Sequence, residues 1–305
     1  MTVAEGMQLL QSFSDAVAQL AESVSPSVAG INAGRRGGTG IVWSGDGQIV
    51  TANHVVGDAP MPKVLLSDGR ELEAKVVARD RYSDVAVLKV DAHGLKPVRL
   101  GDGADLKVGQ FVLALANAFG KTASATSGIV TSQGRSMRGW WGTVIEDAVV
   151  SDAKLNPGYS GGPLVDASGR LLGMNVAYFA GRGIALSIGS LKRVVETLFR
   201  DGKVRKGFLG VVVEPIALPD ELAKSSEVGQ DGGLLVRSVE GESPARTAGV
   251  AIGDVILRLG EARATDEQEL HKALSGDLVG RTVSLWILRS EKLTELRIAP
   301  GEAEE

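Results

Sequence analysis

Residues 156–164 read Asn156-Pro157-Gly158-Tyr159-Ser160-Gly161-Gly162-Pro163-Leu164. Glycines on both sides of Ser160 let the backbone turn sharply, which leaves one hydroxyl exposed and points successive N–H groups at one place. A serine in this setting is suited to be a nucleophile, and the amides of Gly158 and Ser160 are suited to hold an oxyanion. A glycine-rich hairpin with an incidental serine fits the same stretch, so the remainder of the chain must decide between the two.

A serine hydroxyl needs a base to take its proton, and that base is usually a histidine oriented by a buried carboxylate. The chain has three histidines. His54 follows the β-rich run 49–52, which places it at the end of a predicted strand. His93 lies in a turn-like segment and His271 in a mixed-charge helical segment, so we expect both to be solvated surface residues.

A candidate for the carboxylate is Asp84, which directly precedes the alternating apolar run 85–89. It is expected at the start of a strand, where it can turn inward, although an aspartate at this position can equally cap a turn. The chain order His54, Asp84, Ser160 favours the catalytic interpretation. It is the order of chymotrypsin-type proteases, and it differs from the orders in subtilisin and in α/β-hydrolases.

These motifs resemble those of a known family, the HtrA (Deg) serine proteases, in which a trypsin-like domain is followed by a PDZ domain. Residues 51–56 are similar to the family's histidine motif, 84–89 to its aspartate motif and 156–164 to its serine motif. The resemblance extends over nearly everything after about residue 24. It departs at Tyr159, where the family usually has Asn, and at Lys154, where the family has a small residue. We therefore expect a bulkier and more basic rim around the active site.

The resemblance implies a mainly β fold: a chymotrypsin-like double β-barrel, then a small α+β PDZ domain. An N-terminal amphipathic helix, predicted from periodicity alone, precedes them. The resemblance implies an ATP-independent serine endopeptidase that acts on unfolded or misfolded proteins in protein quality control and assembles as a homotrimer or a multiple of trimers. It also implies an S1 pocket lined by Leu155, Asn175 and Ile184. Two rival functions stay open. One is a largely inactive chaperone or sensor that binds peptides, and the other, weaker one is an esterase on the same barrel.

Composition excludes several other classes of protein. The chain has 305 residues, 44% of them hydrophobic, which is typical of a globular protein of two or three domains. A net charge of −4 without a long basic run argues against a nucleic-acid partner. No nucleotide-binding motif occurs, so no cofactor is expected. The absence of cysteine removes disulfides and Cys-containing zinc sites, and no metal site is expected.

The compartment stays open at this level. No basic residue precedes Arg35 and no long apolar segment comes before it, so we expect neither a signal peptide nor a membrane span in the chain as given. Family members are mostly exported or membrane-tethered. That implies a periplasmic or other extracytoplasmic protein whose signal or anchor is absent from this chain, while a cytoplasmic protein is also compatible.

Periodicity divides the chain into segments. Apolar residues recur every three or four positions in residues 3–24, which predicts an amphipathic helix. Glycine turns then separate short β-rich runs, typical of antiparallel barrels, until a helix at 190–201. The predicted division is an N-terminal helix in 1–25, a trypsin-like protease domain in 26–200, a linker in 201–206, a PDZ domain in 207–300 and a tail in 301–305.

The predicted peptide site of the second domain begins with Phe208, Leu209, Gly210 and Val211, which resemble the carboxylate-binding loop of PDZ domains. Such a loop binds the C-terminus of an extended peptide that adds to a strand edge. The helix predicted at 266–274 would form the other wall of the groove, with Leu270 and Leu274 facing the peptide. Leu274 fits the domain core equally well.

Overall fold

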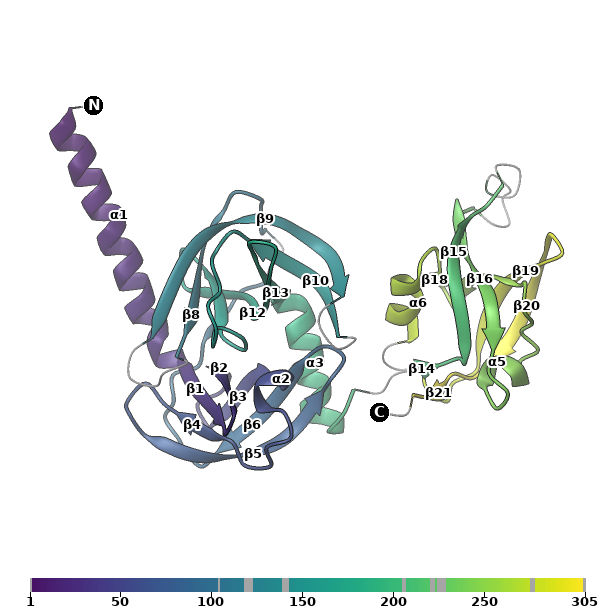
Figure 1. Cartoon of the computed structure of the whole chain (residues 1–305), viewed down its shortest axis with the longest axis horizontal. Coiled ribbons are helices and arrows are strands. Elements are labelled where there is room, and N and C mark those ends of the chain that lie inside the picture. Colours follow the sequence, from purple (N-terminus) through teal and green to yellow (C-terminus); the bar gives the residue numbers. More distant parts are fainter. Residues whose placement is uncertain are drawn as a thin grey trace. The chain divides into compact units, whose positions relative to one another are not determined.

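The computed structural model describes residues 2–103, 105–117, 123–138, 143–204, 207–219, 223, 229–274 and 278–303 (Figure 1). The chain divides into two compact units, Met1–Lys203 and Val204–Glu305. The predicted fold class is confirmed: the protein is mostly β, with two barrels in the first unit and a small α+β domain in the second. The finer division of the chain stays a prediction, and residues 205–206 of the linker and 304–305 of the tail lie outside the described residues.

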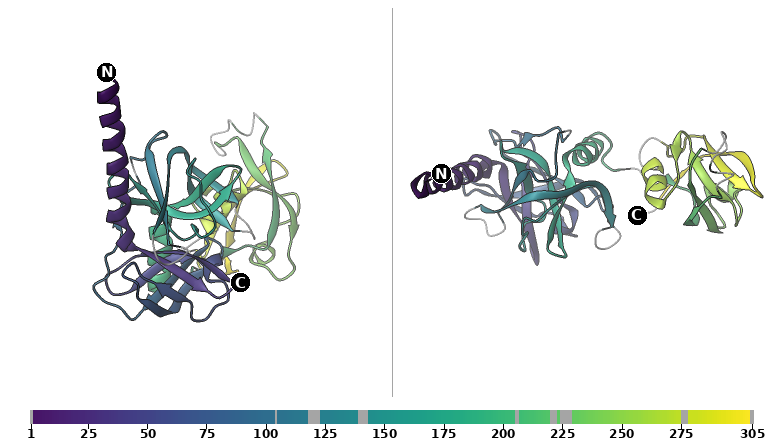
Figure 2. Two further views of the ribbon diagram at one scale, coloured as in Figure 1. Left: turned by 60° about the vertical axis from the view of Figure 1, so that its left-hand side comes forward. Right: turned by 90° about the horizontal axis from the view of Figure 1, so that it is seen from above.

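The predicted N-terminal helix is present as α1 (Val3–Val24), and its apolar stripe divides in two. The C-terminal half packs onto the second barrel, with Leu20 and Val24 in a cluster that includes Leu113. The N-terminal half extends away from the barrels (Figures 1 and 2), and Met7 and Leu10 are 67% and 71% exposed. The stripe therefore has a partner within the chain over only part of its length.

The first barrel is closed by six strands in the order β1-β2-β3-β6-β5-β4. Glycines in β2 allow close approach, since a Cβ on Gly40 would lie 2.7 Å from a side-chain carbon of Ile49. A single helical turn, α2 (Asn53–Val56), follows β3 directly and carries His54. The strands are β1 (Val28–Ala33), β2 (Arg36–Val42), β3 (Gln48–Ala52), β4 (Lys63–Leu65), β5 (Glu71–Asp80) and β6 (Val85–Val90).

The second barrel is a seven-stranded sheet in the order β11-β8-β9-β10-β13-β12-β7, in which β11 also pairs with β12 and so closes the ring. The predicted helix after it is α3 (Ile188–Asp201), which ends at Gly202 in the left-handed conformation (φ 72°). The strands are β7 (Arg99–Leu100), β8 (Phe111–Ala116), β9 (Ser124–Arg138), β10 (Val144–Ser151), β11 (Pro163–Asp166), β12 (Arg170–Phe179) and β13 (Arg182–Ser187).

The second unit is built on a sheet in the order β15-β16-β17-β19-β20, so β15 is an edge strand. Its core includes Leu234, Ile256 and Leu285. The helices are α5 (Pro244–Thr247) and α6 (Glu267–Leu274). The strands are β14 (Gly207–Phe208), β15 (Val211–Ala217), β16 (Gly232–Val239), β17 (Val255–Leu259), β18 (Ala262–Arg263), β19 (Val283–Arg289), β20 (Lys292–Ile298) and β21 (Gly301–Glu302).

Candidate active site

Asp84 holds both the backbone and the ring of His54. Its carbonyl accepts the N–H of Asn53 (3.0 Å) and its Oδ1 accepts the N–H of His54 (2.9 Å), so it caps the start of α2. Its Oδ2 lies 2.5 Å from His54 Nδ1. Asp84 adopts a left-handed backbone (φ 57°), which aspartate tolerates better than most residues, and it is 5% exposed. A buried carboxylate on Nδ1 favours the tautomer that leaves Nε2 free to accept a proton.

The turn that carries Ser160 lies against the end of β3. Gly161 has a left-handed backbone (φ 82°), and a Cβ there would lie 2.1 Å from the carbonyl oxygen of Thr39 and 2.9 Å from the amide nitrogen of Ala52. Only glycine fits this position, for both reasons. Since Ala52 immediately precedes α2, this packing brings Ser160 next to the segment that carries His54.

The Ser160 hydroxyl donates to the carbonyl of Val176 over 3.4 Å, which is a long and weak hydrogen bond. In the described part of the chain no hydrogen bond joins this hydroxyl to His54. Rotation about the Cα–Cβ bond of Ser160 redirects the hydroxyl, and hydrogen bonds of this kind often tighten only when substrate is bound. The His54 side chain is 29% exposed and is therefore accessible to a substrate.

The oxyanion hole is predicted at the backbone around Gly158, which is left-handed (φ 94°). The N–H of Tyr159, between the two predicted donors, is bonded to the carbonyl of Asn156 (3.1 Å). Among the described residues, the N–H groups of Gly158 and Ser160 have no protein acceptor. Two unpaired donors beside the nucleophile are what an oxyanion hole requires.

Tyr159 corrects one expectation about the rim. Its side chain is 4% exposed and belongs to the core of the second barrel, together with Val112, Val149 and Leu164. Burial raises the pKa of the Tyr159 hydroxyl, and the neighbouring Thr126 partly offsets that increase. The prediction that this tyrosine makes the rim bulkier is wrong, because the turn that exposes Ser160 directs the preceding side chain inward.

The residues predicted for the S1 pocket fall into two groups. Leu155 and Ile184 are 8% and 4% exposed, and Leu155 lies against Gly183, where an added Cβ would be 3.1 Å from its Cγ. Asn175 is 1% exposed, and its side-chain amide donates to the carbonyl of Pro163 (3.1 Å), under the nucleophile turn. Asn175 therefore supports the turn, and its place in the pocket wall has no support from these contacts.

Asp152 is the acidic residue nearest in sequence to the predicted S1 residue Leu155, and it is tied to a neighbouring strand. Asp152 Oδ1 accepts the N–H of Ile129 (2.6 Å), which ties this carboxylate to β9. Lys154, the other departure from the family pattern, is exposed, as expected for a residue that makes the surroundings of the site more basic.

Three polar residues around the site escaped the sequence analysis. Arg36 donates to the carbonyl of His54 (3.3 Å) and Arg79 to that of Gly57 (2.7 Å), so both hold the C-terminal end of α2. Thr39 on β2 is fully buried and bonds to the nucleophile turn. A threonine between glycines in a strand was the only signal for Thr39. Arg36 and Arg79 lie on strands that are distant from each other in sequence, and no pattern in the sequence pointed to either of them.

In the predicted peptide site of the second unit, the carbonyl groups of the loop at 209–210 are held by hydrogen bonds. The carbonyls of Leu209 and Gly210 accept the N–H groups of Ala245 and Glu240, both at 2.9 Å. These carbonyls point into the domain, so the N–H groups of the same trans peptides, those of Gly210 and Val211, point the opposite way. Leu270 and Leu274 are 3% and 7% exposed and belong to the domain core, so their contact with a peptide stays a prediction.

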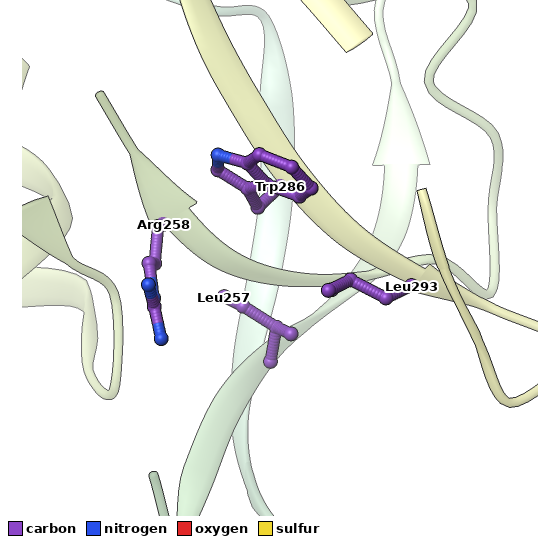
Figure 3. Close-up of a pocket in the computed structure, with 4 residues that line it drawn as sticks. All are labelled: Leu257, Arg258, Trp286 and Leu293. Atoms are coloured by element: carbon purple, nitrogen blue, oxygen red, sulfur yellow. The ribbon is translucent and has the colours of Figure 1, made fainter. Parts of the chain in front are cut away.

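A small pocket lies elsewhere on this unit, on β17, β19 and β20 rather than at the edge strand β15. It is lined by Leu257, Arg258, Trp286 and Leu293 (Figure 3). Within the described ranges, no group of three or more His, Asp or Glu side chains is arranged to hold a metal ion. No helix in that part of the chain combines the length and the apolar character needed to cross a membrane.

Comparison with known proteins agrees with this geometry. The model of the trypsin-like peptidase domain matches residues 38–174, and that of the PDZ domain matches residues 207–299. Among solved structures, the HtrA-type protease AlgW with tripeptide is 33% identical, covers 94% of this chain and 97% of its own, and has a TM-score of 0.83. This chain belongs to the HtrA family. A second solved structure, the serine endoprotease from Yersinia pestis, is 30% identical with a TM-score of 0.79 and covers 94% of this chain and 98% of its own.

Curated relatives of this HtrA protein carry the name probable periplasmic serine endoprotease DegP-like. The relative from Pseudomonas putida is 38% identical over 274 residues, which are 87% of this chain and 56% of the relative. The relative from Brucella suis is 36% identical over 269 residues, which are 86% of this chain and 52% of the relative. The chain thus spans about half the length of the curated relatives that it matches.

Proposed function

We propose that this HtrA protein is a serine endopeptidase that cleaves unfolded or misfolded proteins in protein quality control. The observation that carries the proposal is the pair of bonds from Asp84 to His54, which fix the imidazole beside the glycine turn of Ser160. In this proposal Ser160 attacks the peptide carbonyl while His54 takes its proton and passes it to the leaving amine. Asp84 stabilises the imidazolium, and the amides of Gly158 and Ser160 bind the oxyanion.

The proposal is tested with a fluorophosphonate probe, which reacts only with an activated serine. We expect a covalent adduct on Ser160, located by mass spectrometry, both with and without an unfolded protein substrate. The rival function, a largely inactive chaperone or sensor, predicts an unlabelled Ser160 under both conditions. The unpaired N–H groups of Gly158 and Ser160 support the protease over this rival, because no acceptor in the described part of the chain competes with an oxyanion for them.

Cleavage is expected after small or medium aliphatic residues such as Val, Ala or Leu. The proposed S1 pocket has the apolar side chains of Leu155 and Ile184, and Oδ1 of the nearby Asp152 is held on β9 by the N–H of Ile129. Each misplaced methylene in such a pocket changes the selectivity by roughly 1–3 kcal/mol. Mass spectrometry of the fragments of a denatured protein measures the preference. Replacement of Leu155 by alanine should shift it to larger apolar residues, and a dominance of Arg or Lys would overturn the pocket assignment.

The second unit is proposed to bind peptides with a free, apolar C-terminus along the edge strand β15. The outward N–H groups of Gly210 and Val211 would bind the carboxylate, as in other sites that add a strand to a sheet edge. We expect a free-acid peptide to bind and the same peptide with an amidated C-terminus to bind much more weakly. Calorimetry on the full chain with Ser160→Ala measures both, since this variant cannot consume the peptide. Equal affinities would refute the site.

We propose a homotrimer, or a multiple of trimers, in which the N-terminal half of α1 contacts another copy. Met7 and Leu10 are largely exposed, whereas the second half of the stripe already packs on its own barrel. Sedimentation of the full chain and of a variant without residues 1–11 tests the contact, because this deletion keeps the packed part of α1, including the edge-to-face contact of Phe13 with Phe111. An unchanged oligomer would show that this helix is not the contact. The double variant Met7→Gln, Leu10→Gln removes the same apolar surface from a chain of full length and is the matched companion to the deletion.

An extracytoplasmic location is the last part of the proposal. The curated relatives are named periplasmic endoproteases. Fractionation of cells that express the natural gene with a C-terminal tag would test it, and recovery of the protein only with cytoplasmic markers would contradict it.

A further inference from the structure

Every polar group of Thr39 is hydrogen-bonded, and two of them, the N–H and the hydroxyl, connect the first barrel to the nucleophile turn. Its N–H donates to the carbonyl of Ser160 (3.0 Å), and its hydroxyl donates to the carbonyl of Gly158 (2.7 Å). The same hydroxyl accepts the N–H of Asn117 (3.0 Å), and its carbonyl accepts the hydroxyl of Thr51 (2.6 Å). The side chain is fully buried, so water does not compete for these bonds.

The two bonds to the turn act on the carbonyls of Gly158 and Ser160, the residues whose amides form the proposed oxyanion hole. A glycine with φ 94° has no Cβ to restrict the direction of its peptide groups, so Gly158 needs an external contact to keep one orientation. The bond from the Thr39 hydroxyl supplies such a contact on one side of Gly158. The methyl group of Thr39 faces Gly162 in the same turn, where an added Cβ would lie 3.1 Å from it.

We propose that Thr39 is a positioning residue that fixes the oxyanion hole before substrate binds. The inference rests on the proposed protease function and adds a residue to it. A threonine on a strand of the first barrel sets the backbone of a turn that belongs to the second. Its hydroxyl does not touch the substrate. It holds the Gly158 carbonyl, and through it the peptide groups next to the oxyanion donors.

The test compares Thr39→Val, Thr39→Ser and Thr51→Val in the full chain. Valine keeps the shape of threonine but leaves the carbonyl of Gly158 and the N–H of Asn117 unpaired, and serine keeps the hydroxyl. Thr51→Val is the matched control, because it also removes a fully buried hydroxyl from the adjacent strand but leaves both bonds to the turn. A displaced oxyanion donor lowers kcat by on the order of 100-fold.

We expect Thr39→Val to lower kcat for a peptide substrate about 100-fold with little change in KM. We expect the kcat of Thr39→Ser to be close to that of the wild type. Thr51→Val should lower the melting temperature about as much as Thr39→Val does, but its kcat should stay within about tenfold of the wild type. Equal kcat losses in Thr39→Val and Thr51→Val would overturn the inference, because the loss would then follow stability. Unchanged kcat in Thr39→Val would overturn it as well.

A second readout separates this inference from the proposed function. The backbone amide resonances of Gly158 and Ser160 report the geometry of the turn whether or not the protein is catalytically active. We expect them to shift in Thr39→Val and to stay near their wild-type positions in Thr51→Val and Thr39→Ser. If the wild type takes no fluorophosphonate label, the protease proposal fails, while these resonances still decide on Thr39. If they do not move in Thr39→Val, the inference fails even when the wild type is active.

Discussion

Replacement of Ser160 by alanine is expected to abolish cleavage of an unfolded protein while the fold stays intact. The hydroxyl makes one long hydrogen bond, to Val176, so its removal should change the free energy of unfolding by no more than about 0.5 kcal/mol. The loss of the nucleophile should lower kcat by on the order of 10⁶-fold. Fragments on a gel and the melting temperature measure the two effects. Ser168→Ala, at an exposed turn of the same unit, is the control and should keep full activity.

His54→Ala is expected to lower kcat nearly as much as Ser160→Ala does. The double variant should lower kcat no further than either single variant. Nucleophile and base act as one unit, so the two losses do not add. A His54→Ala variant that retains near-full activity would refute the assignment of the base. A double variant much slower than both single variants would show that the two residues act independently.

Asp84→Asn should lower kcat by roughly 10⁴-fold without unfolding the protein. Asparagine also tolerates the left-handed backbone of this position (φ 57°), so the turn can keep its shape. An amide that donates to His54 Nδ1 would favour the tautomer with its proton on Nε2, and that nitrogen could no longer accept the proton of Ser160.

The control for this variant is Asp80→Asn, which changes another buried acid of the same turn. Asp80 accepts the N–H and the hydroxyl of Ser83, so its carboxylate supports the turn rather than the imidazole, and we expect a lower melting temperature with kcat within about tenfold of the wild type. A similar loss of kcat in both variants would mean that the turn as a whole, and not the carboxylate on His54, sets the activity.

Local patterns in the sequence predicted much of this structure. Apolar residues at helical spacing predicted the bounds of α1, and the runs 49–52 and 85–89 predicted β3 and β6 to within a residue at each end. The order of His54, Asp84 and Ser160 indicated the barrel and the residues of the candidate site together. These features depend on spacing along the chain, which the sequence records directly.

The features that the sequence did not predict depend on contacts between segments that are distant along the chain. The bond from Thr39 to Gly158 spans 119 positions, and no periodicity relates two residues at that separation. The inward direction of Tyr159 follows from how the turn packs on the second barrel, and the division of the α1 stripe follows from where Phe111 and Leu113 lie. Each of these results requires the tertiary structure, which neighbouring residues do not specify.

The distribution of the candidate site over two barrels has a consequence for biosynthesis. His54 and Asp84 belong to the first barrel, which ends with β6 at Val90, while Ser160 lies in a turn of the second barrel. A nascent chain that has folded only its first barrel carries a base and no nucleophile, so it cannot digest its neighbours or itself. Hydrolytic capacity then arises only when the second barrel folds against the first and the turn docks on Ala52. In the proposed protease, correct folding would itself be the step that produces activity.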